Sequence, residues 1–304
     1  MKIYNIKGNT YYFETKYSYI PFYKLNDNEI VMLDSGYYGT DDKIIQELIS
    51  KYNFNVKAVI CSHGHIDHIG NNFWLQEKYN TEIIMSDYES NFCESVYGLK
   101  SFHFTVYLKG ADKRFEPIPF ITDRKITNSD KYIEISGHRF EIVQLPGHTY
   151  FHLGIITPDN VFYVGDSLLS SEAIKENKLS FSSNILLDIN SKEKIRNTKC
   201  DKYILAHKGV YDYSIINELI DQNILFYEEQ MQLIIDSVKD HMTFDDIFKE
   251  IINKLQISKH ASSYVQTERI IKNFINYLLE NGVLRIEIED DTLKYCRNKH
   301  IAIE

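Results

Sequence analysis

The sequence predicts an α/β fold with a small α+β module at its C-terminal end. An apolar segment at residues 56–62 reads as a buried strand, and segments with helical spacing of apolar residues, 40–52 and 70–80, lie on either side of it. Strands that alternate with helices predict a sheet covered by helices. Composition and pattern then change near His241, so we predict a main domain of residues 1–240 and a module of residues 241–304.

In the N-terminal part of the main domain, the sequence pattern predicts several strands in succession. An Asn26-Asp27-Asn28 turn separates the last two of them, and the helix at 40–52 follows after a Thr-Asp cap. The predicted strands of this half, including those that flank the helix at 70–80, cover residues 2–6, 10–15, 19–25, 29–36, 56–62 and 82–86.

Residues 87–124 predict an insertion, because regular periodicity is lost there and aromatic side chains accumulate. These aromatic residues line a substrate pocket, or they form a local core or a dimer interface; both readings stay open. Strands resume after the insertion, and an amphipathic helix is expected over residues 214–238. The later strands are predicted at 131–135, 138–145, 152–157, 161–166 and 201–207.

The C-terminal module predicts two helices and a hairpin. Thr243 is placed as a cap with Asp246 three residues later, and the second helix ends at Asn281-Gly282. Residues 285–296 read as the hairpin. This order of elements is typical of a winged-helix-like module.

Charge and composition narrow the function classes. The net charge of -9 is spread along the chain, which argues against nonspecific binding to nucleic-acid phosphates. No apolar run has the length of a membrane span, and the N-terminus lacks the pattern of a signal peptide. The four cysteines are isolated and predict neither disulfides nor a cysteine zinc site. We therefore expect a cytoplasmic protein that does not bind a membrane.

The densest chemical signal is the stretch SHGHIDHIG, directly after the predicted strand at 56–62. It contains His63, His65, Asp67 and His68. A helix would turn His63 away from the others, whereas a loop at the end of a strand lets all four side chains converge. Imidazoles and a carboxylate are ligands that suit Zn²⁺, Fe²⁺ or Mn²⁺.

Three further polar residues follow predicted strands later in the chain. They are His148 in LPGHT, Asp166 in VGDS and His207 in LAHKG. Each alone reads as an ordinary turn residue. Because polar groups at the carboxyl ends of strands face one crevice in an α/β sheet, the four pieces together predict a metal site.

With these pieces in this order, the sequence resembles the metallo-β-lactamase superfamily, from its N-terminal strands to about Val210. The resemblance implies a four-layer αββα sandwich with two metal ions, expected to be zinc, with iron or manganese as alternatives. Asp34, in LDSG, matches an acidic support residue, and Asp67 and Asp166 are the expected catalytic residues. The implied ligands are His63, His65 and His148 for one ion, Asp67, His68 and His207 for the other, and Asp166 as the bridge.

The segment PGHTYFHLG further resembles the GHTxxHxG turn of the glyoxalase II-like branch. His152 in this turn is expected to be structural. The turn at His207 departs from the usual Gly-His-Gly pattern, and Lys208 beside it is expected to be a solvated side chain. No basic cluster marks a glutathione site, so the thiol carrier stays open.

The implied activity is hydrolysis of a thioester, ester or lactone of a small molecule. Two cations that share a water lower its pKa from about 15.7 toward about 7, so a bridging hydroxide is the expected nucleophile. The alternatives are an RNA endonuclease with a winged-helix-like tail and a non-enzymatic effector-binding protein. The hairpin carries four acidic residues against Arg285 and Lys294, which disfavours nucleic acid. We expect the tail to shape the active site or to pair subunits as a homodimer.

Overall fold

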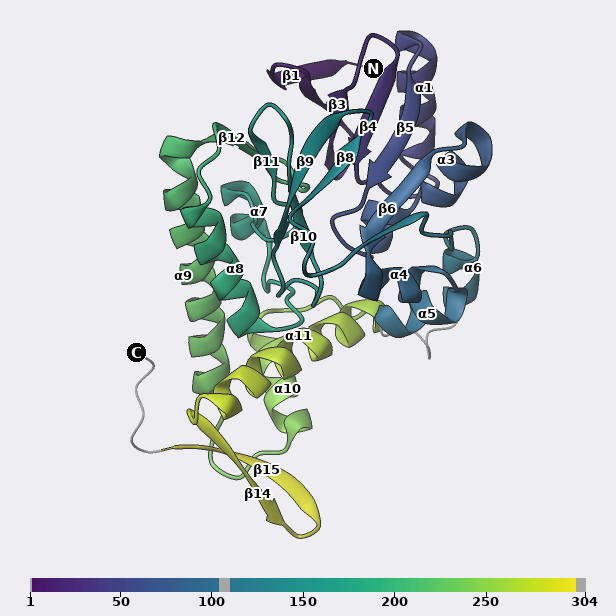
Figure 1. The fold of residues 1–304 in the computed structure, drawn as a ribbon. Coiled ribbons are helices and arrows are strands. Elements are labelled where there is room, and N and C mark those ends of the chain that lie inside the picture. The colour runs from purple at the N-terminus through teal and green to yellow at the C-terminus, as the bar shows by residue number, and fades with distance from the viewer. Residues whose placement is uncertain (1, 104–109, 299–304) are drawn as a thin grey trace.

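The computed structural model describes residues 2–103 and 110–298, which form two packed sheets, a hairpin and surrounding helices (Figure 1). Among these residues, the first sheet has seven strands, in the order β1-β2-β3-β4-β5-β6-β7, and the second has six, in the order β13-β12-β11-β10-β9-β8. The strands of the first sheet are β1 (Ile3–Lys7), β2 (Thr10–Glu14), β3 (Tyr19–Lys24), β4 (Glu29–Leu33), β5 (Asn55–Ile60), β6 (Glu82–Ser86) and β7 (Arg124–Ile126). Those of the second are β8 (Tyr132–Ile135), β9 (His138–Gln144), β10 (Leu153–Ile156), β11 (Val161–Tyr163), β12 (Lys202–Ile204) and β13 (Val210–Asp212).

Strand β4 shows why the two sheets stack. Its residues Val31 and Leu33 pack in the cluster between the sheets, while Ile30 and Met32 pack in a second cluster on the opposite face. Because both faces of the strand are covered, its sequence is a nearly continuous apolar run. Burial of each such side chain stabilises the fold by roughly 1.5–3 kcal/mol.

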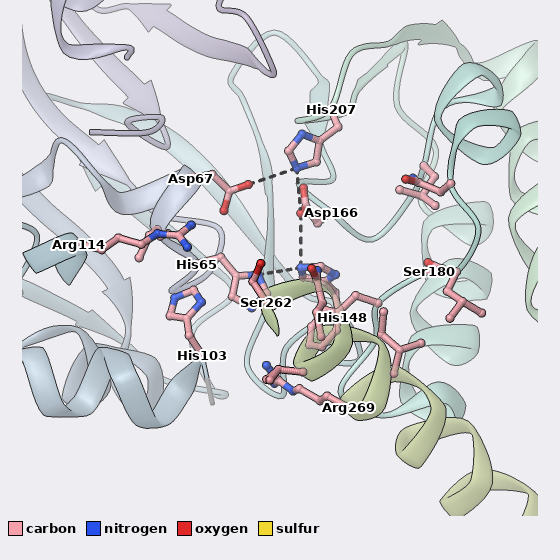
Figure 2. Close-up of a pocket in the computed structure, with 18 of the residues that line it drawn as sticks. His65, Asp67, His103, Arg114, His148, Asp166, Ser180, His207, Ser262 and Arg269 are labelled. Carbon is pink, nitrogen blue, oxygen red and sulfur yellow. Dashed lines mark hydrogen bonds and ion pairs between the residues drawn. The ribbon is translucent and has the colours of Figure 1, made fainter. Parts of the chain in front are cut away.

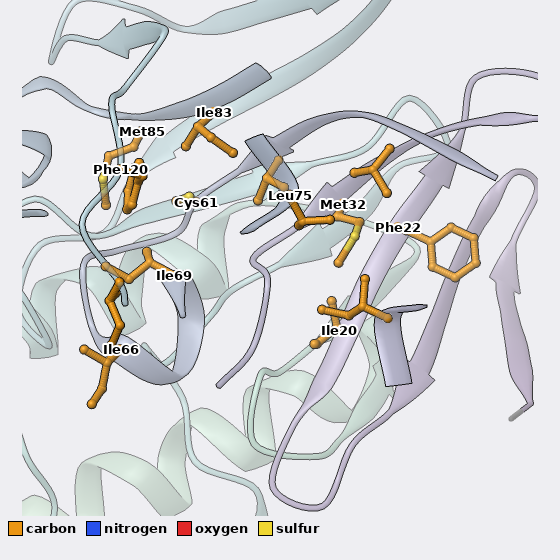
Figure 3. Packing of buried hydrophobic residues seen from close by; sticks show 14 of the residues in the cluster. Ile20, Phe22, Met32, Cys61, Ile66, Ile69, Leu75, Ile83, Met85 and Phe120 are labelled. Atoms are coloured by element: carbon orange, nitrogen blue, oxygen red, sulfur yellow. The ribbon is translucent and has the colours of Figure 1, made fainter. Parts of the chain in front are cut away.

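Helices cover the outer face of each sheet. The cluster in Figure 3, which includes Ile20, Met32 and Leu75, joins the first sheet to α1 (Asp42–Tyr52) and α3 (Asn72–Tyr79). On the second sheet, α8 (Ile185–Asn197) and α9 (Tyr213–Ser237) contribute Ile195 and Leu219 to another cluster. The helix, sheet, sheet, helix layering confirms the predicted αββα fold.

The predicted insertion at residues 87–124 contains regular structure. It forms the short helices α4 (Asp87–Cys93), α5 (Val96–Phe102) and α6 (Ala111–Phe115) and ends in the edge strand β7. The aromatic residues Phe104 and Tyr107 of the predicted insertion lie outside the described residues. Two further short elements that the sequence did not predict are α7 (Ser171–Glu176) and β13.

Helix α8 was also missed, because part of its buried face is polar and charged. Asp188, Ser191 and Lys192 are all buried. The Lys192 ammonium lies 3.0 Å from Asp188 Oδ1 and donates to the Ser167 carbonyl at 2.9 Å, and the Tyr227 hydroxyl donates to Asp188. This buried network joins α8 and α9 to the loop that follows β11.

The C-terminal module has the predicted order of elements. It comprises α10 (Phe244–Lys254), α11 (Ala261–Glu280) and the hairpin β14 (Leu284–Glu289) with β15 (Thr292–Arg297). A capping box at Thr243 and Asp246 starts α10, as predicted. The module packs on α9 through one shared apolar cluster that includes Met231 and Phe274. The boundary at residue 241 stays a prediction.

In the part of the chain that the structure describes, no helix combines the length and the apolarity that a membrane crossing requires.

We predict that Lys192→Met destabilises the protein by about 3–5 kcal/mol, because it leaves the Asp188 carboxylate buried without its cation. Denaturant unfolding of the variant measures this loss. The double variant Lys192→Met, Asp188→Asn should recover part of it, and Lys175→Met, at an exposed lysine of α7, should change stability little. Equal stabilities of the Lys192 and Lys175 variants would contradict the role of the pair.

Candidate metal centre

All seven sequence-predicted ligands meet at one edge of the sandwich. Figure 2 shows His65, Asp67, His148, Asp166 and His207 pointing toward one another. The loop after β5 supplies His63 and His65, the one-turn helix α2 (Ile66–Ile69) supplies Asp67 and His68, and the segments after β9, β11 and β12 supply His148, Asp166 and His207. The prediction that a loop holds all four motif residues is therefore wrong for Asp67 and His68, because the chain turns into a helix at Ile66.

The first group of candidate ligands consists of His63, His65, His148 and Asp166. The Nδ1 atom of His65 lies 2.9 Å from His63 Nε2 and 3.0 Å from His148 Nε2. Burial lowers the pKa of His63 and His65 well below the usual value and also lowers that of His148. These imidazoles are therefore neutral, which is the form that binds a metal.

The second group consists of Asp67, His68 and His207. Asp67 Oδ2 lies 3.5 Å from His207 Nε2 and 3.7 Å from His68 Nε2. Asp166 belongs to both groups by position, since its Oδ2 lies 3.4 Å from His148 Nε2, 3.4 Å from His68 Nε2 and 3.3 Å from His207 Nε2. One carboxylate oxygen thus faces imidazoles of both groups.

The second group favours positive charge. The Asp166 carboxylate raises the pKa of His207 to about 9, against the opposing effect of burial. Burial would lower the pKa of His68, but Asp166, Asp67 and Asp34 raise it well above its usual value. In turn, His207 and His68 overcome burial and hold the pKa of Asp166 well below its usual range. A proton or a metal cation satisfies this demand for charge.

Two buried atoms of the site also fit a metal ion. His68 Nε2 and Asp166 Oδ1 have no hydrogen-bond partner among the described residues. Leaving a buried polar group unsatisfied costs about 1–3 kcal/mol, so a ligand that contacts both atoms is favoured. Neutral imidazoles with carboxylates form a donor set that suits Zn²⁺, Fe²⁺ or Mn²⁺.

Asp34, the expected support residue, fixes the orientation of His68. Its Oδ2 accepts a hydrogen bond from His68 Nδ1 at 2.7 Å and from the Tyr163 hydroxyl at 2.5 Å. Its Oδ1 accepts from the Ser62 backbone N–H at 2.6 Å. Because Nδ1 is held by Asp34, Nε2 of His68 is directed into the ligand cluster.

His152 and Lys208, which lie beside the predicted ligands in the sequence, have different environments in the structure. His152 is fully buried, and its Nε2 accepts a hydrogen bond from the Asp166 backbone N–H at 3.2 Å. Its ring therefore helps to position Asp166. Lys208 adopts a positive φ of 65°, in the turn directly after His207.

Glu89, in the predicted insertion, is a site-supporting residue that the sequence reasoning missed. Its Oε2 accepts from the Gly64 N–H at 2.6 Å, and its Oε1 accepts from the Thr149 hydroxyl at 2.5 Å and the Phe151 N–H at 3.2 Å. The carboxylate thereby joins the loop of the first motif to the loop of His148. Burial raises the pKa of Glu89 to about 7. An isolated glutamate without a motif gave no signal in the sequence.

A cavity of about 410 Å³ opens onto the ligands. Its walls come from the insertion, which supplies His103, Arg114 and Phe115, and from helix α11 of the C-terminal module. Arg269 of α11 lies over the Phe181 ring at 4.4 Å and faces the cavity together with Arg114 (Figure 2). The C-terminal module therefore shapes the site, which was one of the two roles expected for it.

An αββα sandwich with two neighbouring groups of His and Asp side chains at one edge is the architecture of a metal-binding protein. The family model described as the metallo-beta-lactamase superfamily matches residues 17–207, and the chain belongs to this superfamily.

Curated relatives are similar over part of their length. The chain is 28% identical over 144 residues to hydroxyacylglutathione hydrolase GloC of Haemophilus influenzae, covering 47% of this chain and 63% of that protein. It is 26% identical over 154 residues to a hydroxyacylglutathione hydrolase of Vibrio cholerae, covering 51% of this chain and 48% of that protein. The chain thus spans about half to two thirds of the length of these relatives.

Solved structures share the fold over nearly the whole chain. A beta-lactamase domain protein from Burkholderia ambifaria has a TM-score of 0.73 and 16% identity, and the match covers 98% of this chain and 94% of that one. The metallo-beta-lactamase family protein TTHA1429 from Thermus thermophilus has a TM-score of 0.71 and 14% identity, with 95% and 99% coverage. Since these matches extend past residue 207, they include the C-terminal module in the shared architecture.

We predict that Asp166→Asn lowers the affinity for metal at both groups, because Oδ2 of Asp166 faces imidazoles of both. Turnover of any hydrolysed substrate should fall by about a hundredfold or more. The control variant is Asp67→Asn, which changes a residue of the second group alone and should leave one ion bound. Elemental analysis of both purified variants measures the difference, and a wild-type metal content in Asp166→Asn would refute the shared position.

Metal binding to the second group should weaken as the pH falls. Below about pH 9 the metal-free protein holds a proton on His207, and a cation must displace it. Each displaced proton lowers the apparent affinity about tenfold per pH unit below that pKa. Calorimetric zinc titrations between neutral and alkaline pH give the binding constant at each pH. Repeating them in buffers of different ionisation enthalpy gives the number of protons released. A binding constant that does not change with pH would contradict the charge assignment.

Proposed function

We propose that the protein is a two-metal hydrolase that cleaves a thioester, ester or lactone of a small molecule, with zinc as the metal and iron or manganese as alternatives. The observation that carries the proposal is the position of Asp166 Oδ2 between the two groups of candidate ligands. His63, His65 and His148 would hold one ion, Asp67, His68 and His207 the other, and Asp166 would contact both.

When bound, such a metal pair lowers the pKa of a water toward about 7 and stabilises negative charge on a carbonyl oxygen. The chain itself supplies the positions. Asp67 and Asp166, the proposed catalytic carboxylates, each place Oδ2 near His207 Nε2, at 3.5 and 3.3 Å. Asp34 orients His68, and His152 holds the backbone of Asp166. These buried supports fix the orientation of His68 and the position of Asp166.

The cavity supports a small substrate with an anionic group. Its volume of about 410 Å³ lies in the range of small-molecule sites. Arg114 and Arg269 line it, although the chain as a whole carries a net charge of -9. The similar relatives are named as hydrolases of hydroxyacylglutathione, an acyl derivative of a thiol, which makes thioesters the first class to test.

The charges of the hairpin support a small molecule over RNA. The Arg285 guanidinium pairs with Glu287 at 2.9 Å and donates to the Arg297 carbonyl at 2.6 Å, so its positive charge is paired within the hairpin. Glu289, Asp290 and Asp291 add negative charge at the tip. Counterion release, which supplies most nonspecific affinity for nucleic acid, is correspondingly weak.

The test is a panel of thioesters, esters, lactones and single-stranded RNA with the zinc-loaded protein. We expect hydrolysis of at least one acyl class, abolished by a chelator and restored by added zinc, and no cleavage of RNA. Metal-dependent RNA cleavage without acyl hydrolysis would contradict the proposal in favour of a nuclease. A metal-loaded protein that cleaves neither class would favour the non-enzymatic, effector-binding reading.

A further inference from the structure

A second cavity, of about 560 Å³, lies beside the metal cavity and is the larger of the two. Val265 and Arg269 of α11 line both, so the two cavities meet at this helix. The second cavity is bounded by the insertion helices α4 and α5, the turn after His148 and the polar face of α11. Its aromatic lining residues are Phe92, Phe102, Tyr150 and Phe151.

The aromatic wall connects the second cavity with the metal site. The ring of Phe102 lies 5.5 Å from that of His65, a candidate ligand, measured between centroids. Phe151 stacks on Tyr88 at 4.0 Å and an interplanar angle of 10°, which holds the turn after His148 against α4. A group bound against Phe102 would therefore lie in the second cavity and beside a candidate metal ligand.

The aromatic lining is left partly open to solvent. Phe92 is 41% exposed and Tyr150 is 54% exposed, and both face the cavity from different elements. Large apolar groups that gather around a cavity are typical of a site that a ligand covers.

The wall that α11 contributes is polar, and two of its side chains are paired with other groups of the chain. Lys272 donates to Glu268 at 2.6 Å, and Asn273 donates to the Ser182 carbonyl at 2.6 Å. Apart from Arg269, this wall therefore shows no strong preference for a charged ligand. Arg269 lines both cavities and stands where they meet. A substrate that extends from one cavity into the other would pass this side chain.

We propose that the second cavity binds an apolar arm, an acyl chain or an aromatic group, of the same substrate whose reacting bond lies at the metal centre. The inference rests on the proposed function and adds a substrate class to it: thioesters or esters with a long apolar arm. Each methylene buried there should improve kcat/KM about fourfold until the cavity is filled.

To test the inference, a bulky side chain is introduced at an exposed residue that lines the second cavity. Asn276 lines only the second cavity, and its side chain is exposed, so Asn276→Trp should narrow the cavity without disturbing the core. The matched control is Glu280→Trp, an exposed residue at the end of the same helix that lines neither cavity. Both variants should keep the metal content of the wild type.

Two substrate series identify the arm. One series is acyl thioesters of a single thiol, from acetyl to decanoyl, and the other is acetyl thioesters of thiols with longer and longer chains. The wild type and Glu280→Trp should prefer the long members of one series, and Asn276→Trp should lose that preference by about tenfold or more in kcat/KM, while turnover of the shortest member of the series stays unchanged. No length preference in the wild type, or equal loss for short and long substrates, would overturn the inference.

A binding measurement separates this inference from the proposed function. Anilinonaphthalene sulfonate, a fluorescent probe whose aromatic rings carry one sulfonate group, should bind the zinc-loaded wild type and Glu280→Trp, and it should bind Asn276→Trp at least about tenfold more weakly. If the wild type hydrolyses no acyl substrate, the proposed function fails while this titration still reports on the cavity. Probe binding that is the same in all three proteins would contradict an apolar site here.

Discussion

The carboxylate of Asp34 joins the two sheets at the edge where the candidate ligands meet. It stands at the end of β4 in the first sheet, with a left-handed φ of 67°, and accepts a hydrogen bond from Tyr163 of β11 in the second sheet. The same carboxylate holds Ser62 and His68. The motif after β5 and the aspartate after β11 therefore keep a fixed relation to each other, which a shared metal pair requires.

The other ligand-bearing loops have buried polar anchors of their own. Glu89 joins the motif loop to the turn of His148, and His152 holds the backbone of Asp166. Lys192 donates to Ser167, next to Asp166, and pairs with Asp188. Burying these polar groups costs free energy of desolvation, and their hydrogen bonds offset this cost. The same hydrogen bonds fix the loops that carry the candidate ligands.

The sequence predicted what depends on local pattern. The strands and helices with regular apolar spacing were found, and the seven candidate ligands were found because each follows a strand in a recognisable short motif. Helix α8 was missed because Asp188, Ser191 and Lys192 interrupt its apolar face. Glu89 was missed because its partners are distant in sequence. The placement of α11 over the site likewise depends on packing with α9, which no local pattern encodes.

The charge balance of the site explains why Asp166 is central. Its Oδ2 faces imidazoles of both groups, and its other carboxylate oxygen is buried without a hydrogen bond among the described residues. Anomalous diffraction from crystals of the zinc-loaded protein tests this directly. We predict two zinc peaks, one among His63, His65 and His148 and one among Asp67, His68 and His207, each in contact with Asp166. A single peak, or peaks that do not touch Asp166, would contradict the account.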